Sequence, residues 1–76
     1  MPRPLPVING KKLVRFFQAM GFVKSRTKGS HCILRKRGII RPIVVPLYDE
    51  IPKKIILNNL KTSGLTQQNL LDWLKK

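Results

Sequence analysis

The chain has 76 residues, which suffice for one small domain but leave no room for a second domain or a deep substrate cavity. Its 16 lysines and arginines against 3 acidic residues give a net charge of +13, which favours a polyanionic partner, nucleic acid before an anionic membrane surface. One cysteine and one histidine exclude an internal disulfide, leave too few ligands for a structural zinc site, and suit a reducing cytoplasm.

The beginning of the sequence predicts an extended segment followed by a helix. Residues 1–8 are rich in proline and predict a lead-in to a single domain at residues 9–76. Asn9 is a typical N-cap, and Gly21 suits the position after a helix, so we expect a helix over residues 10–20. No run reaches the roughly 20 apolar residues of a membrane span, so we expect no membrane-embedded segment. The apolar face of the helix consists of Leu13, Phe16, Phe17 and Met20.

Three strands are predicted after the first helix. They are short runs of alternating or β-branched residues, at residues 22–26, 30–36 and 39–45. Residues 27–29 predict a tight hairpin connection, in which Gly29 takes a left-handed conformation. Because proline cannot donate to a ladder, Pro42 and Pro46 place the third strand at an edge of the sheet or end it early.

Two helices are predicted at the end of the chain. Pro52 suits the first turn of a helix that Gly64 ends, with Leu65 placed to contact Leu60 across that end. Thr66 is expected to cap the last helix, whose buried side holds Leu70, Leu71, Trp73 and Leu74. The order α-β-β-β-α-α predicts an α+β domain, in which a three-stranded antiparallel sheet carries helices on one face.

Several chemistries are excluded by what the sequence lacks. It has no glycine-rich phosphate loop. Asp49 and Glu50 are neighbours without a second acidic cluster, which excludes a two-metal nuclease site. Ser30 and His31 are expected to point to opposite faces of a strand, which argues against a Ser-His-Asp triad. We therefore expect no metal and no small-molecule cofactor.

The hairpin around His31 is the strongest candidate site. Gly29 lets the backbone approach a ligand closely, and Ser30 is an accessory candidate beside it. A positioned histidine can remove the proton of an RNA 2′-hydroxyl while cations stabilise the charge on phosphorus, a reaction that DNA cannot undergo. A histidine in a strand is more often structural than catalytic, so the residues alone leave its role open. The cations expected to contact RNA phosphates are Lys24, Arg26, Lys28, Arg35, Arg37, Lys53 and Lys54.

The order of motifs along the chain carries a family resemblance. The phrase Thr27–His31 resembles the signature of HicA-type toxins. The helix ending in Met20–Phe22, the segment Val44–Leu47 and the segment Ser63–Thr66 are similar to that family in the same order. The resemblance covers residues 5–76, which is nearly the whole chain.

The resemblance implies a double-stranded-RNA-binding-domain-like fold and ribosome-independent cleavage of mRNA by a toxin. It also implies a HicB-type antitoxin that covers the active site, and it places the family's catalytic histidine at His31. Many members have a second histidine directly after the first and another after the Val-Pro phrase, where this chain has Cys32 and Tyr48. A His-His acid-base pair is therefore excluded, and Tyr48 is the candidate for donating a proton or a hydrogen bond.

Two other functions fit the same composition. A non-catalytic module of the same fold can hold RNA by charge and shape, because the fold does not decide the function. A protein-interaction module can use its basic face to bind an acidic antitoxin or regulator. The substitution His31→Ala separates the first two hypotheses, because it abolishes cleavage without altering RNA binding only if His31 is catalytic.

Overall fold

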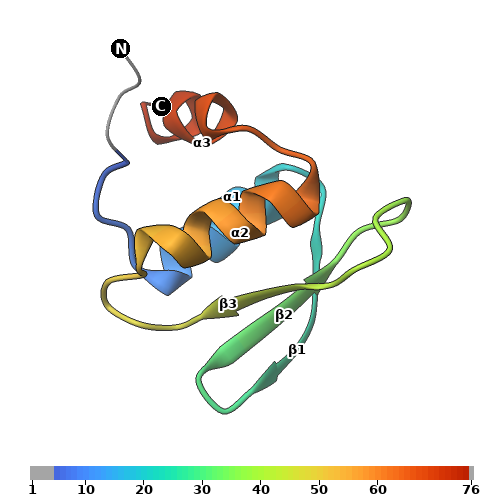
Figure 1. The fold of residues 1–76 in the computed structure, drawn as a ribbon. Helices are drawn as coiled ribbons and strands as arrows, with labels where there is room; N and C mark the ends of the chain where they lie inside the picture. Colours follow the sequence, from blue (N-terminus) through green and yellow to red (C-terminus); the bar gives the residue numbers. More distant parts are fainter. Residues whose placement is uncertain (1–4, 76) are drawn as a thin grey trace.

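The structure, a computed structural model, describes residues 5–75 and contains three helices and three strands in the predicted order. Their bounds are α1 Gly10–Ala19, β1 Val23–Lys28, β2 His31–Arg35, β3 Ile43–Pro46, α2 Lys53–Ser63 and α3 Gln67–Leu74. The strands form one antiparallel sheet in the order β1-β2-β3. Figure 1 shows α1 and α2 on one side of this sheet, with α3 beyond them. The predicted α+β fold is confirmed.

Capping residues determine where α1 begins and ends. The side chain of Asn9 accepts a hydrogen bond from the amide of Lys12 at 2.8 Å, so the predicted N-cap is confirmed. At the other end Gly21 has a φ of 100°, and the amides of Gly21 and Phe22 donate to carbonyls of the last turn. This is a Schellman motif, and it turns the chain from the helix directly into β1.

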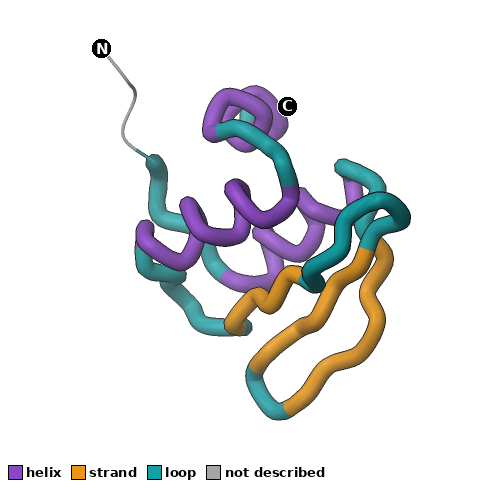
Figure 2. Tube along the Cα trace, turned by 45° about the vertical axis from the view of Figure 1, so that its right-hand side comes forward, coloured by secondary structure: helices purple, strands orange, loops and turns teal. Residues whose placement is uncertain are grey.

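The hairpin between β1 and β2 is longer and tighter than predicted. The first strand ends at Lys28 instead of residue 26, so the connection is the dipeptide Gly29–Ser30 instead of residues 27–29. Gly29 has a φ of 59°, as expected for a residue without a Cβ atom in a two-residue turn. In Figure 2 this hairpin extends beyond the helices, and every residue of β1 is accordingly exposed.

The third strand is much shorter than the predicted run 39–45. Gly38 turns the chain with a φ of 91°, and Pro42 has no amide to donate, so the ladder starts only at the following residue. β3 lies at an edge of the sheet, as its prolines indicate. The side chain of Asn59 in α2 donates to the carbonyl of Val44 at 3.2 Å, which satisfies one group of this open edge.

The ends of the two C-terminal helices are capped as predicted at Gly64 and Thr66, but Pro52 lies elsewhere than predicted. Pro52 precedes α2 as its cap residue and does not lie in the first turn. Gly64 ends α2 with a φ of 76°, and the amide of Leu65 donates to the carbonyl of Leu60 at 3.0 Å. Thr66 caps α3 and forms a capping box there.

The core lies between the helices and one face of the sheet. Cys32 and Leu34 of β2 point into it, because both are buried while their neighbours along the strand are not. Phe16 of α1 is buried, and Trp73 of α3 packs edge-on against it with ring centroids 5.7 Å apart. Leu70 is buried and Leu74 is partly buried against the core, whereas Leu71 is partly exposed and is not part of this packing.

The described part of the predicted lead-in joins this core. Residues 1–4 lie outside the described residues, but Ile8 is buried and its carbonyl accepts the amide of Ile51 at 2.9 Å. In residues 5–75, none of the helices has the length and apolar character that crossing a membrane requires.

Candidate functional site

His31 lies at the start of β2 on the sheet face that points away from the helices. Its neighbour Cys32 is buried in the core, so alternation along the strand turns the His31 ring to the opposite face. The ladder pairs His31 with Lys28 of β1 on one side and with Pro46 of β3 on the other. The ring is half-buried, and the ring of Tyr48 stands edge-on to it with centroids 6.1 Å apart.

Two backbone contacts hold Tyr48 beside His31. The carbonyl of Ser30, in the hairpin turn, accepts the amide of Leu47 at 2.6 Å, and the carbonyl of Tyr48 accepts the amide of Gly10 at 2.9 Å. Gly10 is buried at the start of α1, where a Cβ atom would press on the carbonyl oxygen of Pro46 and lie 2.6 Å from the Cα of Leu47. The first turn of α1, the hairpin and the loop after β3 therefore meet at one point.

The open face of the sheet combines cations with apolar side chains. The register places Arg26 opposite Ile33 and Arg35 opposite Val23, all on the face that carries His31. Val44 of β3 pairs with Ile33 on the same face. This face can therefore bind a polyanion by charge and also contact bases or apolar protein groups.

One predicted phosphate-binding residue lies on the other face. Strict alternation would put Lys24, Arg26 and Lys28 on one face, but the ladder has an irregularity between Lys24 and Arg26. The extra residue, Ser25, makes a β-bulge, and the side chains before and after it point to opposite faces. Lys24 consequently pairs with Leu34 and faces the helices, so it does not share the face of His31.

The remaining predicted cations lie at the two ends of the sheet. Arg37 lies in the turn after β2, at the opposite end of that strand from His31, so the structure does not bring these two residues together. Lys53 and Lys54 are exposed in the first turn of α2. Figure 1 shows that α2 begins at the same end of the sheet as the hairpin, but α2 packs on the face opposite to that of His31.

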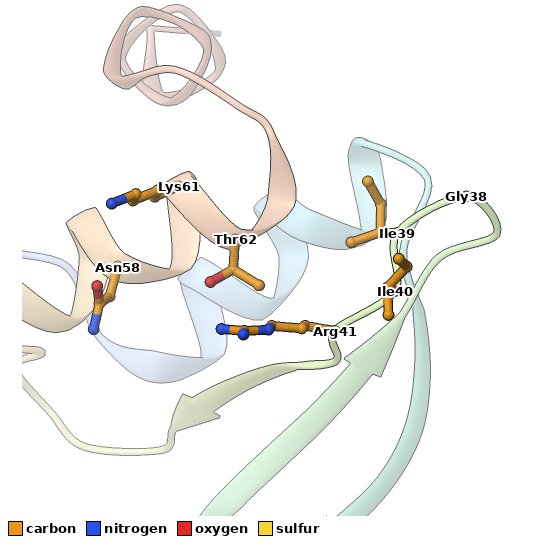
Figure 3. A pocket seen from close by; sticks show the side chains of 7 residues that line it. All are labelled: Gly38, Ile39, Ile40, Arg41, Asn58, Lys61 and Thr62. Atoms are coloured by element: carbon orange, nitrogen blue, oxygen red, sulfur yellow. The ribbon is translucent and has the colours of Figure 1, made fainter.

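Two surface hollows flank the sheet. The first, the α1–β1 cleft, has a volume of about 280 Å³ and is lined by Lys11, Val14, Arg15, Gln18, Lys24, Thr27, Cys32 and Leu47. The second, the Arg41–Lys61 groove, has a volume of about 490 Å³ and is lined by Gly38, Ile39, Ile40, Arg41, Asn58, Lys61 and Thr62. Figure 3 shows Arg41 extending from the loop before β3 toward Thr62 and Asn58 on α2. Neither lining contains a carboxylate.

Sequence reasoning missed the cations that α1 contributes. Lys11, Arg15 and Gln18 stand at spacings of four and three residues, so they share one face of the helix. That polar stripe is visible in the sequence, but nothing there shows that a strand faces it. Gly10 was also missed, because a glycine required by close packing has no local signature.

The fold and the site together define a small basic α+β domain with one histidine among cations on an uncovered sheet face. Residues 10–65 match the model of a family described as HicA toxin of bacterial toxin-antitoxin, and the chain belongs to this family. The match is narrower than the predicted resemblance over residues 5–76 and stops before α3.

A solved structure supports the same assignment. A chain of a toxin–antitoxin complex from Streptococcus pneumoniae is 36% identical and superposes with a TM-score of 0.65. The similarity covers 75% of the present chain and 97% of that chain. No match was found among curated proteins.

Proposed function

We propose that this toxin is an endoribonuclease that cleaves mRNA without a metal ion, with His31 as its general acid and base. The observation that carries the proposal is the setting of His31. It is half-buried on an open sheet face, paired with Lys28 in the ladder and edge-on to Tyr48, in a chain of the HicA family. We propose the cytoplasm as the place of action, since mRNA is there.

The reaction needs few groups, and each has a candidate here. His31 removes the proton of a 2′-hydroxyl, and the oxygen attacks the adjacent phosphorus. The bond from phosphorus to the 5′-oxygen then breaks, giving a 2′,3′-cyclic phosphate and a 5′-hydroxyl. Lys28 stabilises the charge that develops on the phosphoryl oxygens. The leaving oxygen takes its proton from His31, while the hydroxyl of Tyr48 donates a hydrogen bond.

The test is cleavage of a labelled single-stranded RNA by the purified chain in EDTA. We expect cleavage with 2′,3′-cyclic phosphate ends. A single-stranded DNA of the same sequence should not be cleaved, because it lacks the 2′-hydroxyl nucleophile. Loss of cleavage in EDTA would contradict the metal-independent mechanism. Cleavage of the deoxyribose substrate would contradict attack by the 2′-oxygen.

RNA is held, in this proposal, by Lys28, Arg26 and Arg35 on the His31 face and by Lys53 and Lys54 at the start of α2. Arg37, beyond the far end of β2, adds to the positive electrostatic potential that attracts RNA. It contacts RNA directly only when the RNA is long enough to reach that end of the sheet. Affinity should fall steeply with salt, with a slope of roughly 0.7 per phosphate contact for a single strand. An affinity independent of salt would contradict RNA binding by these cations.

The partner we propose is a HicB-type antitoxin that covers the open face. The toxin–antitoxin complex from Streptococcus pneumoniae supports such a partner. Ile33, Val44 and the cations Arg26 and Arg35 offer an acidic protein both apolar contacts and charge. Adding the antitoxin should stop RNA cleavage, and Arg26→Glu should weaken the complex. An antitoxin that binds while cleavage continues would contradict coverage of His31.

The second candidate function is RNA binding without cleavage. It is favoured by Cys32 and Tyr48, which stand where the family pattern has histidines, so that only His31 remains. Salt-sensitive RNA binding without any cleavage would support this second function. In that case Tyr48→His and Cys32→His are the substitutions to examine for restored cleavage.

A further inference from the structure

We propose that the α1–β1 cleft is a subsite for one nucleotide of the RNA, next to the phosphate at which cleavage takes place beside His31 but on the other face of the sheet. The inference rests on the proposed function, because RNA is taken as the substrate. It adds a binding site built by α1, a helix that contributes none of the phosphate-binding residues predicted from the sequence.

Local features of α1 and β1 create the cleft. The bulge at Ser25 turns Lys24 toward α1, whereas Arg26 and Lys28 remain on the His31 face. Because the hairpin extends beyond the helices, the helix side of β1 is left uncovered there, and its residues are exposed (Figure 2). The polar stripe of α1 then faces this uncovered side of β1 across open space.

The lining of the cleft suits a nucleotide. Three cations from two elements line it, Lys11, Arg15 and Lys24, and no carboxylate neutralises them. Its apolar wall consists of Val14, Cys32 and Leu47, of which Val14 and Cys32 are buried in the core. A phosphate fits the cations, a base or ribose fits the apolar wall, and Gln18 and Thr27 can hydrogen-bond polar atoms of either.

The position of the cleft links it to His31. Thr27 pairs with Cys32, and this pair directly follows the pair of Lys28 with His31 along the ladder. A strand of RNA bound in the cleft therefore needs only to pass around the narrow tip of the hairpin to reach the histidine. The volume of about 280 Å³ lies at the lower end of ligand pockets, which suits one nucleotide better than a folded protein segment.

The Arg41–Lys61 groove provides the comparison. This groove is larger than the α1–β1 cleft, but only two cations line it. Its Ile40 is 95% exposed and forms no buried wall. Figure 3 shows the open arrangement of these side chains on the loop and on α2. A substitution of Arg41 removes the same charge as a substitution of Arg15 without touching the cleft, which makes it a matched control.

The first experiment maps binding by amide chemical shifts in the full-length His31→Ala variant. This variant is used so that the probe, a single-stranded oligouridylate, stays intact. We expect the amides of Val14, Gln18 and Thr27 to shift in addition to those around Lys28. Shifts confined to the hairpin tip and the loop after β3, or an absence of binding, would overturn the proposal.

The second experiment measures affinity and its salt dependence in the same background. Arg15→Gln and Lys24→Gln should each weaken binding severalfold and lower the salt slope by about 0.7, whereas Arg41→Gln should change both less. Equal losses for all three variants would show that only net charge matters and would overturn the subsite. Tighter binding of polyglutamate than of oligouridylate to the same amides would instead assign the cleft to an acidic protein.

These measurements also separate the subsite from the proposed function. They record RNA binding in a variant that cannot cleave, so they do not depend on the catalytic role of His31. If the wild-type chain cuts no RNA but the cleft amides still shift, the nuclease proposal fails and the nucleotide subsite stands. If RNA is cut while those amides do not shift, the nuclease proposal stands and the subsite fails.

Discussion

The two faces of β2 differ in burial, although their side chains alternate within a strand of only five residues. On the helix side Cys32 and Leu34 are buried, with 2% and 0% of their surface exposed. On the open side His31 and Ile33 are half-exposed, and Arg35 is exposed. One strand thus separates two tasks, because apolar burial stabilises the fold on one face while the other presents charge and an imidazole to a ligand. Substitutions on the two faces should accordingly have different consequences.

The largest effect on folding is expected for Leu34→Ala. The side chain is fully buried, so its truncation should lower the free energy of unfolding by about 2–5 kcal/mol. That loss is a large part of the roughly 5 kcal/mol that a domain of this size can have. Denaturant unfolding followed by circular dichroism measures it. A loss below about 0.5 kcal/mol, the size usual for surface positions, would contradict the assignment of this face as core.

Gly10→Ala should affect both tasks, because Gly10 lies where α1 contacts the loop that carries Tyr48. The added Cβ atom must displace Pro46 or Leu47, which is expected to cost about 1–3 kcal/mol of unfolding free energy. RNA cleavage by the folded fraction should fall as well, since the displaced loop includes Tyr48. Unchanged stability and cleavage would show that this close contact does not position the site.

Tyr48→Phe should affect only the chemistry. The ring that stands edge-on to His31 is kept, and the hydroxyl is removed. A neutral hydrogen bond contributes roughly 0.5–1.5 kcal/mol, so single-turnover cleavage should slow by about twofold to twelvefold, with stability unchanged. A cleavage rate equal to that of the wild type would remove Tyr48 from the reaction.

Arg35→Gln is expected to have the smallest effect. Arg35 is exposed at the end of β2 farthest from His31, so stability should change by less than about 0.5 kcal/mol. The salt slope of RNA affinity should decrease by about 0.7, the value of one lost phosphate contact. A slope equal to that of the wild type would exclude Arg35 from the RNA-binding face.

The helices that cover the sheet could be predicted from the sequence, because buried side chains recur at regular spacings and helix ends carry typical capping residues. The spacing of Leu13, Phe16 and Phe17, the caps at Asn9 and Thr66, and the glycine ends of α1 and α2 all predict their elements. These signals are local, since each depends on residues within one or two turns. The order of elements followed from these signals, whereas the family resemblance came from motifs such as Thr27–His31.

The arrangement of the open face was less predictable, because it depends on register and on contacts between distant segments. The bulge at Ser25, which sends Lys24 to the other face, has no signature in an exposed strand of alternating cations. The contact of Gly10 with the loop after β3 joins residues far apart in sequence. His31 itself was found by motif, but its pairing with Lys28 came from the ladder.

The most direct test compares cleavage and folding in His31→Ala. The wild type and the variant are assayed with the same RNA in EDTA under single-turnover conditions, and both are unfolded in denaturant. Our account predicts that cleavage falls by about 10²–10⁴-fold, while the unfolding free energy and the affinity for RNA stay within experimental error. Cleavage that persists in the variant, or is lost only together with the fold, would contradict a catalytic role of His31.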